Sequence, residues 1–184
     1  MVAESPGPKP EILRASERKS VPWKNGGGVT SEIAAFPQGS GIDDFGWRIS
    51  TALVTAAGPF SLFEGVDRFL TVLEGRLLLR IDAADSEVTL DRGQSYSFAG
   101  DIAVTGGPLG GPVRDLNVMV RRSDWQAAVT THRPHLSENA ILIAIASQPG
   151  SGLAMLDAVQ LVGDYQLAAD FTGYFIAIRP MAES

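Results

Sequence analysis

The stretch Trp47-Arg48-Ile49-Ser50-Thr51-Ala52-Leu53 alternates in a way that decides the fold. Successive side chains of a β-strand point to opposite faces, so Arg48 and Ser50 share one face and Trp47, Ile49 and Thr51 share the other. Residues 88–90 and 115–120 alternate in the same way, whereas residues 69–73 are almost continuously apolar. A continuous apolar run is typical of a strand buried on both faces.

Turn signals separate these runs at short intervals. They include Gly58-Pro59, Glu64-Gly65, Glu74-Gly75, Asp91-Arg92-Gly93, Ala99-Gly100-Asp101 and Gly106-Gly107-Pro108. Many short strands at such spacing predict an all-β sandwich or barrel. The segment Ser123–Ala128 is the one helix candidate, with Ser123 or Asp124 as its N-cap.

A weak internal repeat links the two halves of the chain. Residues 77–81 and 88–90, followed by Gly93, have an echo in residues 140–145 and 159–161, followed by Gly163. Any β-meander gives such similarity, but a duplicated barrel with its boundary near Arg122 gives it too. The predicted division is a disordered lead-in over residues 1–10, an N-terminal barrel with the pocket over 11–122, and a smaller C-terminal half over 123–184.

Composition excludes several classes of function. The net charge is -6, and the densest basic segments, Arg14–Lys24 and Arg121-Arg122, are short or interrupted, so we expect solvated surface there and no nucleic-acid partner. The absence of cysteine excludes disulfides, cysteine-bound zinc and a thiolate nucleophile. We see no signal peptide and no apolar run long enough to span a membrane, which suits a cytoplasmic protein.

Metal and nucleophile motifs are absent from the sequence. His132 and His135 are the only histidines, and their spacing around Pro134 fits neither two helical nor two strand ligands, so we expect exposed linker histidines, no metal and no cofactor. There is no G-x-S-x-G elbow. Gly26-Gly27-Gly28 is not a P-loop, because Lys24 precedes the glycines and a strand-like run, Val29–Ala35, follows them.

Polar residues within apolar strands remain as candidates for a binding site. Asp115, Asn117 and Met119 share one strand face, as do Thr30 and Glu32, and Arg68 precedes the most apolar strand. A half-solvated sheet gives the same alternation, but together these residues permit a cavity suited to a small anion, because a guanidinium presents a planar fork to a carboxylate. The candidate ligand-binding residues are Trp23, Lys24, Asn25, Thr30, Glu32, Arg48, Ser50, Arg68, Asp115 and Asn117.

Several blocks of the sequence, in order, resemble the HutD/Ves family of bacterial proteins. They are residues 22–30 (PWKNGGGVT), 45–50 (FGWRIS), 58–61 (GPFS), 65–68 (GVDR), 73–75 (LEG), 98–101 (FAGD) and 111–119 (GPVRDLNVM). The resemblance is strong over about residues 20–122 and weak beyond.

The resemblance implies a cupin-type (RmlC-like) jelly roll, with two fused cupin-like halves, associated with histidine utilisation. Metal-binding cupins carry histidine ligands where residues 65–74 lie here, and that segment contains none. The resemblance therefore implies a metal-free cupin that binds an intermediate of histidine breakdown, such as urocanate or a formyl- or formimino-glutamate, in a regulatory or buffering role.

Two other functions remain open at this stage. A metal-independent hydrolase or isomerase could use Lys24, Glu32 or Asp115 as acid or base if burial moved their pKa values toward the working pH. A stress-induced structural protein would need no ligand. Exposed barrel edges are compatible with a homodimer.

Overall fold

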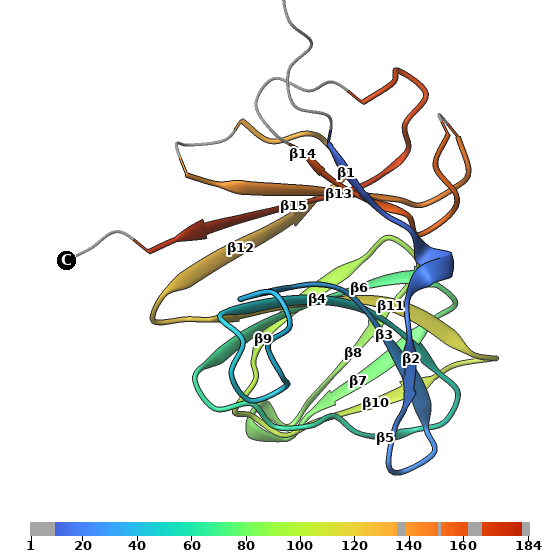
Figure 1. Cartoon of the computed structure of the whole chain (residues 1–184). Coiled ribbons are helices and arrows are strands. Elements are labelled where there is room, and N and C mark those ends of the chain that lie inside the picture. The colour runs from blue at the N-terminus through green and yellow to red at the C-terminus, as the bar shows by residue number, and fades with distance from the viewer. Residues whose placement is uncertain (1–9, 136–138, 151, 162–166, 182–184) are drawn as a thin grey trace, which may run out of the picture. The chain divides into compact units, whose positions relative to one another are not determined.

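The computed structural model describes residues 10–135, 139–150, 152–161 and 167–181 of the 184-residue chain. These residues form strands joined by turns and two short 3-10 helices, which confirms the all-β prediction (Figure 1). The strands are β1 Glu11–Leu13, β2 Ser20–Pro22, β3 Gly28–Phe36, β4 Trp47–Val54, β5 Gly58–Pro59, β6 Val66–Glu74, β7 Leu77–Ile81, β8 Ser86–Leu90, β9 Ser95–Ala99, β10 Val104–Pro108, β11 Val113–Arg121, β12 Trp125–Thr130, β13 Ile141–Ala146, β14 Ala158–Leu161 and β15 Gly173–Pro180. The 3-10 helices are η1 Ala15–Glu17 and η2 Asp82–Ala84.

The chain divides into two compact units. The barrel unit comprises residues 18–127 and 181–184, and the sheet unit comprises residues 1–17 and 128–180, so the division falls inside β12. Residues 11–17 were assigned by the sequence pattern to the first barrel, but the structure places them in the sheet unit, because Glu11 of β1 pairs with Gln160 of β14. The predicted lead-in over residues 1–10 lies, except for Pro10, outside the described residues.

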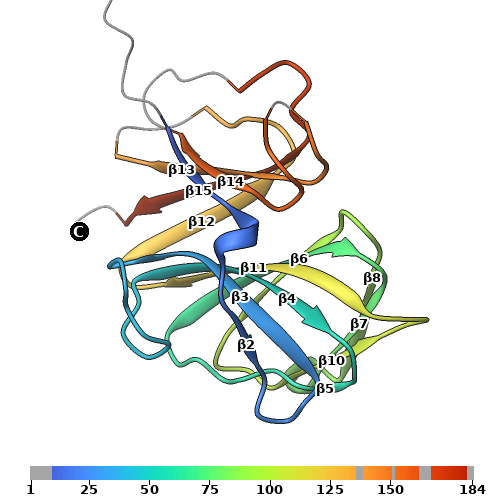
Figure 2. The same cartoon turned by 45° about the vertical axis from the view of Figure 1, so that its right-hand side comes forward.

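Two antiparallel sheets make up the barrel unit. One has the order β2-β3-β4-β11-β6-β9 and the other β5-β10-β7-β8, and they lie opposite each other (Figure 2). Their facing side chains form an apolar core at one end of the barrel, to which Val54, Leu70, Val72, Leu77, Leu79, Ile81, Leu90, Phe98, Val104 and Val113 contribute. The predicted double burial of the β6 run is confirmed for Leu70, Thr71, Val72 and Leu73.

The inward faces of the central strands change from apolar to polar along their length. On β11, Val113 belongs to the core, whereas Asp115 and Asn117, two and four residues further on, line a cavity. On β4 the same change runs from Val54 to Arg48. Because alternate residues of a strand share a face, this change leaves one end of the barrel interior polar.

The sheet unit is a five-stranded sheet in the order β1-β14-β13-β15-β12. β13 pairs with β14 antiparallel, as β7 pairs with β8, so both copies of the sequence repeat form antiparallel strand pairs. Within the described residues this unit has one sheet, and a second cupin-like half stays a prediction of the repeat and of the family resemblance.

The predicted helix over Ser123–Ala128 is wrong. Asp124 closes a turn by donating its N–H to Arg121 O, and β12 begins at Trp125. The Trp125 ring packs edge-on against Phe36 at 5.3 Å, so strand pairing and aromatic packing outweigh the local capping signal.

The predicted solvated surface at Arg121-Arg122 is confirmed for Arg122, which is exposed, whereas Arg121 is half-buried. Arg121 donates to the carbonyl oxygens of Asp43, Phe45 and Glu64, and Arg122 forms ion pairs with Asp67 and Asp101 at 2.9 Å each. These two arginines join loops of the barrel unit. His132 and His135 are also exposed, as predicted.

Candidate functional site

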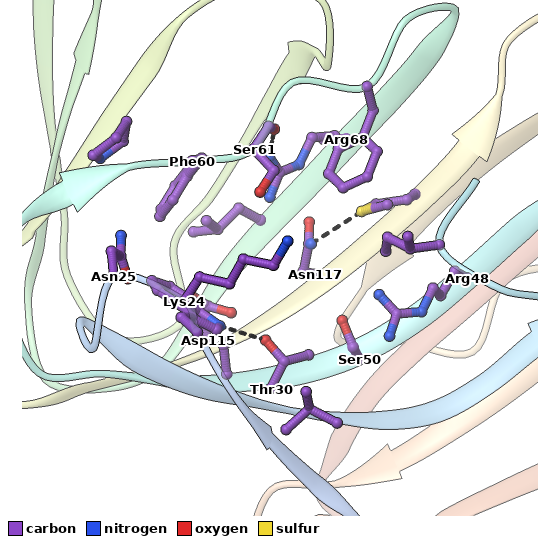
Figure 3. Close-up of a pocket in the computed structure, with 18 of the residues that line it drawn as sticks. Lys24, Asn25, Thr30, Arg48, Ser50, Phe60, Ser61, Arg68, Asp115 and Asn117 are labelled. Carbon is purple, nitrogen blue, oxygen red and sulfur yellow. Dashed lines mark hydrogen bonds between the residues drawn. The ribbon is translucent and has the colours of Figure 1, made fainter.

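A cavity of about 560 Å³ occupies the polar end of the barrel unit (Figure 3). Strands β3, β4, β6 and β11 form one wall of the cavity. The turn after β2 and the segment after β5 supply the rest of its lining. Its lining comprises Val21, Pro22, Trp23, Lys24, Asn25, Thr30, Ile42, Arg48, Ser50, Ala52, Pro59, Phe60, Ser61, Phe63, Arg68, Leu70, Asp115, Asn117 and Met119.

The structure brings nine of the ten predicted site residues to this cavity. They are Trp23, Lys24, Asn25, Thr30, Arg48, Ser50, Arg68, Asp115 and Asn117. Glu32 does not line the cavity, and its carboxylate instead accepts a 2.7 Å hydrogen bond from Arg48 Nε. Their common location supports the prediction that they bind a ligand but does not test it.

The glycine run forms a turn between β2 and β3, as the sequence predicts. The Trp23 N–H donates to Gly28 O at 2.9 Å, and the Gly26 N–H donates to Trp23 O at 3.0 Å. Gly26 has a φ of +71°, a left-handed conformation that favours glycine. Asn25 Oδ1 accepts the Gly27 N–H at 3.0 Å, so this asparagine stabilises the turn that carries Lys24 to the cavity.

Gly28 permits a close approach of Trp23 to the strands. A Cβ atom at this position would lie 2.6 Å from Leu53 O and 3.3 Å from the Trp23 ring. The indole N–H of Trp23 donates to Thr30 Oγ1 at 2.8 Å, and its ring packs edge-on against Phe60. These contacts hold the indole ring on the cavity wall.

Arg68 is a buried cation surrounded by phenyl rings. Its Cζ atom lies 5.3, 5.6 and 5.0 Å from the ring centroids of Phe60, Phe63 and Phe98, and its Nη1 donates to Ser61 O at 3.2 Å. Burial lowers the pKa of Arg68 to about 10, while the negative charge of Asp115 acts in the opposite direction. Arg68 therefore stays charged at neutral pH, and its buried Nε has no hydrogen-bond partner among the described residues.

Asp115 is a carboxyl group of the cavity whose pKa is strongly shifted. Burial raises its pKa to about 7, although the charge of Arg68 and a backbone hydrogen bond from Ala52 oppose the rise. Its Oδ1 atom is buried without a partner among the described residues, as is Oδ1 of Asn117. Buried polar atoms are usually paired with protein, ordered water or a ligand, and these two oxygens are acceptors that the described residues leave unpaired.

Arg48 lies beside Ser50 on β4 (Figure 3), and Arg48 and Arg68 both pair in register with Met119 of β11, so the two arginines lie on the same wall of the cavity. Glu32 holds it through Nε, and the two Nη atoms form no hydrogen bond within the described part of the chain. Lys24 extends from the turn toward Asn117. Three cationic groups from three elements thus face the same space, and Asp115 is the one carboxylate among the described lining residues.

Sequence reasoning missed the aromatic surroundings of Arg68. Phe60 lies in the block 58–61 and Phe63 lies between that block and the next, but the sequence assigns neither a role, because their contact with Arg68 depends on the path of the segment after β5. The core residue Phe98 comes from β9, which pairs with β6 beside Arg68. Only the pairing of these strands reveals the cluster.

The described residues show neither a metal-binding cluster nor a membrane-spanning helix. They contain no cluster of three or more His, Cys, Asp or Glu side chains that could hold a metal ion, and the absence of a metal stays a prediction. No helix among them has the length and apolar character needed to cross a membrane.

Comparisons with known proteins agree with the motif resemblance. The chain is 33% identical to an uncharacterised 21.2 kDa protein in the hutC 3' region of Pseudomonas putida, covering 92% of this chain and 96% of that protein. It is 37% identical to Protein Ves of Citrobacter koseri, covering 80% and 73%.

Two solved structures share the fold over almost their whole length. HutD from Pseudomonas fluorescens SBW25, solved in a formate condition, superposes with a TM-score of 0.79 at 28% identity, covering 95% of this chain and 100% of that one. A conserved protein of unknown function from Pseudomonas aeruginosa PAO1 gives a TM-score of 0.77 at 32% identity, with the same coverage. The HutD family model matches residues 15–170, and the chain therefore belongs to the HutD family.

Proposed function

We propose that this protein binds a small carboxylate intermediate of histidine breakdown, of the urocanate or formyl- or formimino-glutamate type, in a regulatory or buffering role. Membership of the HutD family and a relative encoded beside hutC support the association with histidine utilisation. The ligand class is inferred from the cavity.

The observation that carries the proposal is the buried charge of Arg68 beside unpaired polar atoms in the same cavity. A buried guanidinium needs a compensating anion, and Arg68 forms no ion pair within 4.0 Å among the described residues. Arg48 and Lys24 add further positive charge at the same cavity. The volume of about 560 Å³ lies within the range of small-molecule sites, roughly 300–1,000 Å³.

A thermal-shift panel tests the proposal, with urocanate, formylglutamate, formiminoglutamate, histidine and glutamate. A ligand present at about 100 times its Kd stabilises a fold by roughly 2.7 kcal/mol. For a chain of this size, that raises Tm by about 5–11 °C. No shift with any acid at millimolar concentration overturns the proposal.

Two matched variants locate the bound acid. Arg48→Lys loses the planar fork that binds a carboxylate through two nitrogens, so we expect weaker binding. Arg80→Lys makes the same change on the surface, where Arg80 pairs with Glu87 outside the cavity, and should bind as the wild type does. Equal affinity of all three proteins removes Arg48 from the site.

One observation favours a second candidate, a metal-independent hydrolase or isomerase acting on a related acid. A carboxyl group with a pKa of about 7 suits general acid–base catalysis at neutral pH, and Asp115 lines the cavity. Prolonged incubation of each acid in the panel with the protein, followed by chromatography, distinguishes the two. Product formation that Asp115→Asn abolishes favours the enzyme.

A further inference from the structure

Asp115 presents a carboxylate oxygen to a space that the proposed function assigns to another carboxylate. Asp115 is only 3% exposed, and its Oδ1 atom has no hydrogen-bond partner within the described part of the chain. The backbone of Ala52, its register partner on β4, lies against the same carboxyl group. The unpaired oxygen is thus shielded from bulk water, and it belongs to a residue that lines the cavity.

Three cations from three elements line the cavity with Asp115, and a fourth charged group lies beside one of them. Arg68 projects from β6, Arg48 from β4 and Lys24 from the turn after β2, and Glu32 of β3 is held by Arg48. None of these cations lies within ion-pair distance of Asp115 among the described residues. Arg68 is instead surrounded by phenyl rings and donates to Ser61 O.

Two carboxylates cannot both stay ionised at close range in a space with little water, because like charges disfavour each other's charged form. A protonated carboxyl group, by contrast, donates a hydrogen bond through its O–H. Resting on the proposed function, we propose that Asp115 takes up a proton from solvent when a small carboxylate enters the cavity, and donates it as a hydrogen bond to the bound acid.

The pKa of Asp115 in the free protein sets the direction in which binding depends on pH. Burial already raises the pKa of Asp115 to about 7, and a bound anion that occupies the cations moves it further upward. Below pH 7 Asp115 is already protonated in the free protein, so binding of the acid is accompanied by little proton uptake. Above pH 7 uptake approaches one proton, and affinity falls by up to about tenfold per pH unit until Asp115 ionises in the complex as well.

Isothermal titration calorimetry counts these protons directly. N-formylglutamate serves as the probe at pH 6 and pH 8, because it carries no group that titrates in this range, and urocanate serves as a second probe at pH 8, where its imidazole is neutral. Each titration is repeated in two buffers of different ionisation enthalpy. We expect close to one proton taken up at pH 8, much less at pH 6, and about tenfold weaker binding of N-formylglutamate at pH 8.

Two variants assign the proton to its residue. Asp115→Asn supplies a neutral N–H donor at every pH, so it should bind N-formylglutamate without proton uptake and with equal affinity at pH 6 and pH 8. Asp85→Asn makes the same change at an exposed residue outside the cavity, whose left-handed φ of +43° asparagine tolerates, and should behave as the wild type.

The outcomes separate this inference from the function on which it rests. Binding of either acid to the wild type at pH 8 without proton uptake overturns the role of Asp115 and leaves the proposed function standing. Failure of both acids to bind overturns the two together. If Asp115→Asn does not fold, the proton count of the wild type decides the question alone.

Discussion

The indole N–H of Trp23 donates a 2.8 Å hydrogen bond to Thr30 Oγ1, across the glycine run that separates the two residues. Both side chains line the cavity, so this bond joins the turn after β2 to the inner face of β3. The turn would otherwise depend on its backbone hydrogen bonds and on Asn25.

Thr30→Val keeps the shape of the side chain and removes the acceptor, which leaves a half-buried indole N–H without a partner. We expect a loss of about 1 kcal/mol in the free energy of unfolding, measured by urea denaturation. Thr30→Ser retains the hydroxyl and is the control. A valine variant more stable than the serine variant would show that the bond contributes nothing.

The glycines of the same turn should differ in their tolerance of a methyl group. Gly26→Ala meets no atom within 4 Å and should lose about 1–2 kcal/mol, because an L-residue is strained at a φ of +71°. Gly28→Ala should lose more, since its Cβ would collide with the backbone oxygen of Leu53 and displace the Trp23 ring. Urea denaturation ranks the two, and an equal or smaller loss for Gly28→Ala contradicts the packing described here.

The alternation of β4 and β11 made most of the cavity predictable. Arg48 and Ser50, like Asp115 and Asn117, share a face at period 2, and that face proved to be the inner one. Glu32 pairs with Ser50 in the same register in which Thr30 pairs with Ala52, but its carboxylate is bound by Arg48 Nε and it is not a lining residue. An ion pair between strands depends on the partner strand and leaves no signal in a single strand's pattern.

Long-range contacts explain the other differences between prediction and structure. A local capping signal at Ser123 could not reveal that Trp125 packs against Phe36, some ninety residues earlier. The domain boundary was misplaced for a similar reason, since only the pairing of β1 with β14 assigns residues 11–17 to the sheet unit. Sequence patterns report the neighbours of a residue along the chain, and these features depend on neighbours in space.

Arg121 should control the order of the loop between β3 and β4. Its guanidinium donates to Asp43 O at 2.6 Å, Phe45 O at 3.2 Å and Glu64 O at 3.1 Å. A lysine head cannot reach all three oxygens, so Arg121→Lys should lower the free energy of unfolding by about 1–2 kcal/mol.

Hydrogen exchange provides the local measurement for this variant. Amide exchange over residues 43–46 should accelerate in Arg121→Lys. Arg76→Lys alters an exposed ion pair with Asp91 and should change neither stability nor exchange in this loop. Unchanged exchange in both variants would mean that the loop is held by other contacts.

Asp157 should make the sheet unit sensitive to acid. Its side chain is 2% exposed and accepts hydrogen bonds from Ala15 N at 2.8 Å, Ala154 N at 3.0 Å and Arg14 Nη1 at 2.7 Å. Burial alone would raise the pKa of Asp157, but these hydrogen bonds and the charge of Arg14 outweigh it and hold the pKa below its ordinary value.

A depressed folded-state pKa stabilises the fold above the ordinary aspartate value of about 4, and this stabilisation is lost as pH falls through the folded-state value. Asp157→Asn should therefore be less stable than the wild type by about 1–3 kcal/mol at pH 7, with a difference that shrinks below pH 4. Thermal unfolding from pH 3 to pH 7 measures it. Glu11→Gln changes an exposed carboxylate of β1 and is the control. A difference that is independent of pH would contradict the assignment.

The pairing of Glu11 with Gln160 also has a consequence for synthesis on the ribosome. Strands β2 to β11 emerge one after another and find their partners among themselves, whereas β1 emerges before them and finds its partner only after β14 has been made. At roughly 5–20 residues per second, that delay is on the order of ten seconds. Although β1 leaves the ribosome before the other described strands, it is thus among the last of them to be paired, and throughout that interval it is exposed to chaperones and proteases.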